Sequence, residues 1–196
     1  MEEKDGIKVI KINVFQTAMT LGTYLGLYII LVYALMGLTL KYSALSLVAL
    51  PLLLGIPVVA FFLIKRFRDT NCKPFFPFPV SWMITILTFL FATALSCMTV
   101  YLYLRFIDNG ALAAGMMEQM DNIIVASDAA KQTMTDQAQI DQFQSNIDMF
   151  KNVITWFCSL SPSAMTKQFI QSSLVWGNIL SLIIGIIATK RIRISR

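Results

Sequence analysis

Apolar and charged positions are sharply segregated along this chain. Four long runs without Asp, Glu, Lys or Arg cover residues 12–40, 42–64, 74–104 and 168–189. A helix needs about 20 residues to cross the ~30 Å hydrocarbon core of a bilayer, and all four runs reach that length. Strands with open edges would leave backbone groups unpaired in lipid, so helices are expected. The pattern predicts an all-α polytopic membrane protein with four transmembrane helices near residues 14–38, 43–65, 79–105 and 168–190.

We expect the whole chain, residues 1–196, to form a single membrane domain. Its first apolar run is too long for the core of a secretory signal peptide. The end of that run, Leu38-Thr39-Leu40, lacks the small residues of a cleavage site. The first run is therefore expected to remain in the protein as a span.

The segment between the third and fourth runs, residues 106–166, is polar and acidic, with seven carboxylates against Lys131 and Lys151. Two stretches of it carry apolar residues at spacings of three and four, which is typical of helices. The first has Leu112, Met116, Met120 and Ile123, and the second has Ile140, Phe143, Ile147, Phe150, Ile154 and Phe157. They predict an antiparallel helical hairpin, with Thr135 capping its second helix and Asp136 in the first turn.

The basic residues are divided unequally between the two sides of the predicted spans. Eleven lie near the N-terminus, in residues 65–73 or at the C-terminus, whereas five are Lys41, Arg105, Lys131, Lys151 and Lys167. Lys and Arg are enriched in the cytoplasmic loops of membrane proteins. We therefore expect both termini in the cytoplasm and residues 106–166 as an extracytoplasmic insert of a bacterial inner-membrane protein.

Composition supports a membrane environment and removes several kinds of chemistry. Of the residues 57% are hydrophobic and 14% charged, whereas soluble domains carry about 25% charged residues. The net charge of +5 is gathered at span ends, so lipid and not nucleic acid is the expected partner. There is no His, and the three Cys lie far apart. We expect no catalytic residue, no cofactor and no metal site, and hence a non-enzymatic protein.

Small residues recur at every fourth position on two of the predicted spans. They are Ala18, Gly22 and Gly26 on the first span, and Ser173, Gly177, Ser181 and Gly185 on the fourth. In lipid, small residues let two helix backbones approach closely. The spacing indicates helix-packing surfaces, and packing within the bundle is more typical than docking onto another subunit.

Asn178 lies near the middle of the fourth predicted span. A primary amide at this depth needs a hydrogen-bond partner, and a Ser or Thr of the third span is the expected one. The spans otherwise carry no ionised side chain, which argues against ion-coupled transport. Asn178 is therefore predicted to be a buried polar residue that joins two helices.

Two prolines, Pro51 and Pro57, interrupt the second predicted span, with Gly55 between them. Each removes a backbone donor, so a helix kink is expected there. Broken helices line substrate sites in some transporters, but proline is also tolerated structurally in membrane helices.

A cluster of basic residues, Lys65, Arg66, Arg68 and Lys73, follows the second predicted span and precedes a segment rich in Pro and Phe, residues 74–79. Cations beside aromatic rings suit the headgroup layer of a membrane. An interfacial loop is expected for residues 65–78. An ordinary anchored loop is more typical than a specific site for anionic lipid.

Several short motifs resemble those of the bacterial family called domain of unknown function 4199. They are Leu21-Gly22-x-x-Leu25-Gly26, Arg68-Asp69, Phe106-Ile107-Asp108, Ser161-Pro162 and Lys190-Arg191. The resemblance implies a bacterial inner-membrane protein with four spans and an acidic helical insert. It implies no activity, substrate or catalytic residue.

Two classes of function fit this pattern. The first is an accessory or scaffold subunit that associates with a protein partner, or with itself, through small-residue helix faces or the acidic hairpin. The second is a small transport or lipid-translocation helper, for which the Pro-broken second span is the main argument. A polar cavity between the helices would favour the second class, and a solidly packed bundle would favour the first.

Overall fold

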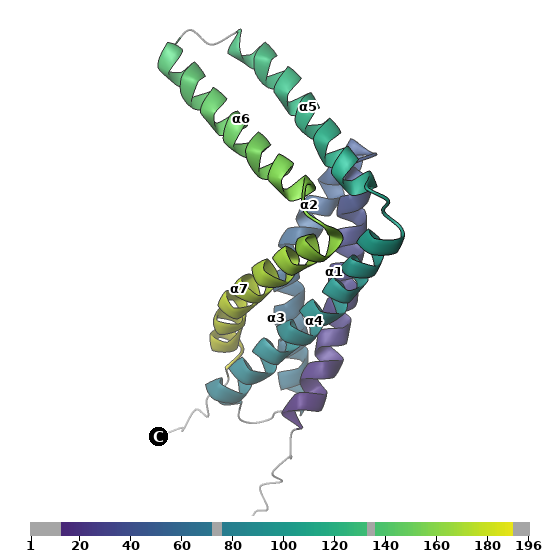
Figure 1. The fold of residues 1–196 in the computed structure, drawn as a ribbon. Helices are drawn as coiled ribbons and strands as arrows, with labels where there is room; N and C mark the ends of the chain where they lie inside the picture. Colours follow the sequence, from purple (N-terminus) through teal and green to yellow (C-terminus); the bar gives the residue numbers. More distant parts are fainter. Residues whose placement is uncertain (1–12, 72–75, 133–135, 190–196) are drawn as a thin grey trace, which may run out of the picture.

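The computed structural model describes residues 13–71, 76–132 and 136–189, and the elements within these ranges are helices joined by short turns (Figure 1). The predicted all-α fold is confirmed. The helices are α1 (Val14–Thr39), the 3-10 helix η1 (Ser43–Leu45), α2 (Ser46–Leu54), α3 (Ile56–Asn71), α4 (Phe78–Phe106), α5 (Ala111–Lys131), α6 (Gln137–Cys158) and α7 (Pro162–Ala188).

Three helices in the described part of the chain, α1, α4 and α7, are long and apolar enough to cross a membrane. Together α2 and α3 also pass this test, but they meet at an angle of 44°. The described part of the chain therefore has three such helices, or up to four spans if the bent pair counts as one. Helix α7 begins six residues before the predicted position 168, because Ser161 caps it and Pro162 can occupy its first turn.

Helix α4 lies between α1 and α7 and packs most extensively against both (Figure 1). Along α1, Gly22 faces Thr88 and Phe91 of α4, and Gly26 faces Leu95, so the two helices run parallel. Along α7, Gly177 faces Phe89 and Gly185 faces Trp82, so α7 runs antiparallel to α4. In the sequence, α2 and α3 follow α1, and together they return the chain to the end of the bundle at which α1 began (Figure 1).

The second predicted span is interrupted at Gly55, between the two prolines. Pro57 has no N–H, so it cannot donate to the carbonyl of Leu53, and the helical ladder stops there. The phenol of Tyr28 on α1 donates a hydrogen bond of 2.7 Å to the carbonyl of Leu52 beside this break. The break is thus a packed feature of the bundle, held by a neighbouring helix.

Helices α5 and α6 form an antiparallel pair that projects away from the bundle (Figure 1). The predicted apolar seam of α6 is half-buried against α5 except at Phe150, which is 49% exposed. Asp136, which was predicted to lie in the first turn of α6, is instead its N-cap, and its carboxylate accepts the N–H of Ala138. The predicted cap Thr135 lies outside the described residues.

The core of the protein lies between the helices of the bundle. It is formed by side chains of α1, α3, α4 and α7, including Leu21, Leu25, Ile64, Ile84, Phe89 and Ile184. Large apolar side chains also cover the outer surface, for example Leu27, Leu31, Leu47, Val58, Trp176 and Ile187. An apolar exterior around an apolar core is expected for helices that lipid surrounds.

Candidate functional site

The closest approach in the bundle is the crossing of α1 and α4. A Cβ atom added at Gly22 would lie 2.6 Å from Phe91 Cβ and 2.9 Å from the carbonyl oxygen of Thr88. One added at Gly26 would lie 3.0 Å from Leu95 Cδ2, and Ala18 is fully buried. Because the obstacles at Gly22 include backbone, only glycine fits there without displacing a helix.

The small residues of α7 meet the opposite side of α4. A Cβ at Gly185 would lie 3.1 Å from the Cα of Trp82, and one at Gly177 would be in ordinary contact with Phe89 at 3.4 Å. Ser181 is buried, and Ser173 is half-buried. The small-residue faces of α1 and α7 are therefore covered within this chain, and they leave no free surface of that kind for docking.

Asn178 does not occupy the buried position that its sequence context predicts. It is exposed on the outer surface of α7, so its prediction as a buried polar residue is wrong. The rotation of α7 explains this position, because Gly177, Ser181 and Gly185 are the residues that face α4. In α4, Thr85, Thr88 and Ser96 donate to carbonyls one turn earlier in their own helix.

The predicted interfacial loop is also partly helix. Lys65, Arg66 and Arg68 lie in the last two turns of α3, because no proline or glycine ends the helix before residue 71, and Lys73 lies outside the described residues. Arg68 is half-buried. Its Nη1 donates to the carbonyl of Ala188 at 3.1 Å, and its Nη2 lies 2.8 Å from Asp69 Oδ1. Arg68 thus satisfies an unpaired carbonyl at the end of α7 and fixes α3 to it.

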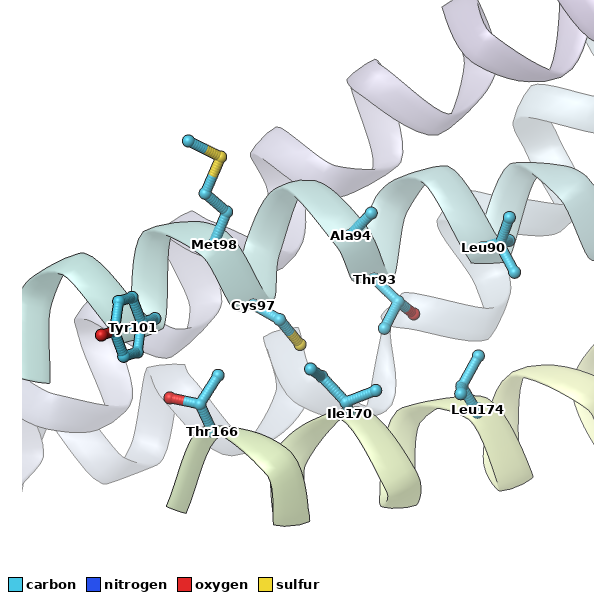
Figure 2. A pocket seen from close by; sticks show the side chains of 9 residues that line it. All are labelled: Leu90, Thr93, Ala94, Cys97, Met98, Tyr101, Thr166, Ile170 and Leu174. Carbon is cyan, nitrogen blue, oxygen red and sulfur yellow. The ribbon is translucent and has the colours of Figure 1, made fainter. Parts of the chain in front are cut away.

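A lateral groove of about 460 Å³ lies between α4 and α7 (Figure 2). Its walls are mostly apolar and are formed by Leu90, Thr93, Ala94, Cys97, Met98, Tyr101, Thr166, Ile170 and Leu174. Figure 2 shows the side chains of Cys97 and Thr93 directed toward Ile170 across the groove. Several of the lining side chains are partly exposed, so the groove opens to the side of the bundle. Its chemistry suits an apolar chain rather than a polar solute.

The hairpin carries two kinds of exposed side chain on α6. Asp141 and Asp148 are exposed, and so are three apolar residues at spacings of four and three, Met149, Val153 and Trp156, here called the α6 patch. At the base of the hairpin, Asp108 is buried and its carboxylate accepts the N–H groups of Gly110 and Leu112. The carboxylates of α6 are therefore solvated, whereas Asp108 holds the turn into α5.

The side chains that could hold a metal ion are dispersed over the described part of the chain. No three His, Cys, Asp or Glu side chains come together within residues 13–71, 76–132 and 136–189. Partial burial raises the pKa of the Cys158 thiol, which contacts the carbonyl of Ala113 at 3.8 Å. A thiol with a raised pKa is a weaker nucleophile at neutral pH.

Residues 20–190 match the family model described as Protein of unknown function (DUF4199). The chain belongs to this family. The DUF4199 match begins in the second turn of α1 and ends just after α7, so it includes the hairpin as well as the bundle. No curated protein and no solved structure matches the chain.

Two features of this DUF4199 protein were missed by the sequence analysis. The α6 patch has helical spacing, but it lies beside a longer seam that accounts for most of the apolar residues of α6. The Arg68-Asp69 motif distinguishes Arg68 from the basic residues around it, but the motif does not indicate a contact with another helix. Its contact with the end of α7 depends on how α3 is placed in the bundle.

Proposed function

We propose that this DUF4199 protein is a non-enzymatic accessory or scaffold subunit of the bacterial inner membrane, which binds a protein partner through its extracytoplasmic hairpin. The observation that carries the proposal is the surface of α6. None of the 22 residues of α6 is buried, and in α5 only Met120 and Ser127 are. A two-helix unit with so little core gains little stability from its own packing, which suits a surface that another protein covers.

The chemistry of that surface indicates what kind of partner would fit. Met149, Val153 and Trp156 are 64%, 54% and 51% exposed, and Asp141 and Asp148 lie on the same helix. Apolar contact at the centre with charges around it is the usual composition of a protein interface. We expect a partner surface that combines apolar and basic side chains.

Four crossings, with both termini in the cytoplasm, are part of the proposal. The direction of the helices supports the four crossings, since α1 and α4 run parallel and only residues 72–77 connect α3 to α4. The distribution of Lys and Arg supports the cytoplasmic side of the termini. Two parallel spans require a return across the membrane between them. The bent pair α2–α3 is long enough for that return, and a re-entrant loop would instead make α4 antiparallel to α1.

A small lipid-translocation helper is the second candidate. The α4–α7 groove favours it, because an apolar groove that opens sideways can hold a lipid chain (Figure 2). A polar route between the helices would be needed for a headgroup to follow. The mostly apolar lining of this groove gives such a route no support, so we rank this function second.

Photo-crosslinking in native membranes tests the hairpin proposal. A photoreactive amino acid at Val153, within the α6 patch, should give one discrete adduct with another protein. The same probe at Asn122, which is exposed on α5 on the side opposite the buried Met120, is the matched control and should give little of that adduct.

Reversing the charge of two carboxylates on α6 provides a second test of the same adduct. The variant with Asp141→Lys and Asp148→Lys should reduce the Val153 adduct, because both carboxylates are exposed on the binding helix. Recovery of lipid adducts alone, or equal labelling from Val153 and Asn122, would remove the support for a partner at the hairpin.

A further inference from the structure

Asn178 lies at the middle of the membrane-spanning part of α7. Lys167 marks one end of the apolar stretch, and the carbonyl of Ala188, bound by Arg68, marks the other. Asn178 is 11 residues from Lys167 and 10 residues from Ala188. At ~1.5 Å per residue, its amide is about 15–17 Å along the helix from either end, which is too far for its short side chain to reach a headgroup.

The amide of Asn178 has no hydrogen-bond partner within the described residues, and its side chain is exposed. The side-chain hydroxyl of Ser181 donates to the backbone carbonyl of Asn178 at 2.8 Å and does not reach its side-chain amide. Hydrocarbon chains can neither donate nor accept hydrogen bonds. A polar group placed this way in lipid is unfavourable until another protein surface pairs with it.

The residues around Asn178 form a continuous exposed stripe with a regular spacing. The stripe consists of Gln168, Gln171, Val175, Asn178 and Leu182, here called the α7 stripe, and all five side chains are exposed. The intervals are three, four, three and four, so Gln171 and Asn178 are one heptad apart, as are Val175 and Leu182. This is the spacing of the seam between two helices in a left-handed pair.

We propose that two copies of this chain pair in the membrane through the α7 stripe, with Asn178 of one copy hydrogen-bonded to Asn178 of the other. A carboxamide donates through its NH₂ and accepts through its oxygen, so the residue is complementary to itself. Copies inserted in the same orientation hold Asn178 at the same depth. A two-fold axis normal to the membrane therefore brings the two amides together without any shift of register.

Pairing through α7 leaves the hairpin proposal independent. The α7 stripe lies in the bundle, whereas the α6 patch lies on the hairpin that projects from it (Figure 1). The dimer would therefore present two hairpins to partner proteins. Loss of self-association would not affect a hairpin partner, and loss of the partner would not affect the dimer.

Disulfide crosslinking in membranes tests the α7 pair. The full-length chain, with Cys72, Cys97 and Cys158 replaced by alanine, receives one new cysteine at Val175 or at Leu182 and is treated with copper phenanthroline. Both variants should form a covalent dimer. Cysteines at Trp176 and Ile183, exposed on the other side of α7, are the matched controls and should form little.

Substitution of Asn178 shows whether the amide holds the pair. Adding Asn178→Leu to the Val175→Cys variant should lower the dimer fraction roughly three- to tenfold, the factor expected for one interhelical hydrogen bond in a membrane. Asn178→Gln keeps a carboxamide and should retain most of the dimer. Leu is more apolar than Asn, so this variant should still insert and fold.

The outcomes that would overturn the pairing are distinct from failure at the hairpin. Equal crosslinking at Val175 and Ile183 would show random collision, and an unchanged dimer fraction in Asn178→Leu would show that the amide is not used. A photoreactive probe at Val175 that captures a different protein, and no second copy, would overturn self-association while leaving the accessory role intact.

Discussion

The bundle and the hairpin both consist of paired helices, but they are held together in different ways. In the bundle, glycines bring α1 and α7 against the backbone of α4, and a buried core fills the space between the helices. In the hairpin, α5 and α6 touch along one half-buried seam and leave α6 without a buried residue. The bundle should therefore tolerate larger side chains poorly, whereas the outer face of the hairpin should tolerate them.

This contrast separates residues that maintain the fold from residues that remain for binding. Small residues in a membrane helix often indicate a surface that docks onto another subunit, but here those of α1 and α7 pack against α4 of the same chain. The surfaces left over are the α6 patch and the α7 stripe, in which apolar or amide side chains face outward. The two proposed binding surfaces therefore lie where the packing rules are broken, at an exposed Asn on α7 and at exposed apolar residues on the hairpin.

The largest effect is expected at the α1–α4 crossing. Gly22→Ala should lower the free energy of unfolding by about 1–3 kcal/mol, because the added methyl meets Phe91 Cβ at 2.6 Å and the Thr88 carbonyl at 2.9 Å. Gly37→Ala on the same helix is the matched control, since nothing lies within 4 Å of its Cβ. The control should be neutral, or more stable by up to about 1 kcal/mol. Thermal unfolding in detergent measures both, and equal stabilities would contradict the proposed crossing.

A smaller and graded effect is expected at the α4–α7 crossing. Gly185→Ala should destabilise the protein by about 1 kcal/mol, because its methyl would lie 3.1 Å from the Cα of Trp82. Gly177→Ala meets Phe89 only at 3.4 Å and should change stability by less than about 0.5 kcal/mol. The same unfolding assay ranks the two variants. The reverse order would mean that α7 is placed differently along α4.

Arg68 offers a polar comparison at the end of the bundle where α3 meets α7. Arg68→Gln removes the donor to Ala188 and the ion pair with Asp69, and about 1 kcal/mol of stability should be lost. Arg66→Gln, two residues earlier and exposed, should be close to neutral. Hydrogen exchange at the last turn of α7 should increase in the first variant only. Unchanged exchange in Arg68→Gln would contradict its role as a cap.

The smallest effect is expected on the hairpin. Val153→Ser in the α6 patch should change the free energy of unfolding by less than about 0.5 kcal/mol, because the side chain is 54% exposed and supports no core. With the photoreactive residue moved to Met149 of the same patch, Val153→Ser should weaken the adduct with a partner. A large loss of stability would show that the patch packs against the protein itself.

The sequence predicted the features that depend on local pattern. Helix α1 was placed to within a residue and α4 to within a residue at each end, because both are bounded by charges or prolines. The interruption of the second span followed from Pro57 and its missing N–H. The hairpin seam followed from apolar spacing, apart from Ile123 and Phe150, which are 38% and 49% exposed.

Features that depend on the third dimension could not be predicted in this way. Whether Asn178 faces α4 or lipid is decided by the rotation of α7, and that rotation is set by Gly177 and Gly185 against α4. The role of Arg68 depends on the distance between α3 and the end of α7. Both details are properties of packing between distant segments, which a single sequence does not specify.

The most direct test of this account is the side of the membrane on which the hairpin lies. Using the chain without native cysteines, one cysteine is placed at Gln142, which is exposed on α6, and others beyond either terminus, and spheroplasts are treated with a membrane-impermeant maleimide. Four crossings predict that Gln142→Cys is labelled in intact spheroplasts, whereas the cysteines at both termini are labelled only after lysis. Labelling of the hairpin and either terminus from the same side would contradict the four-crossing arrangement.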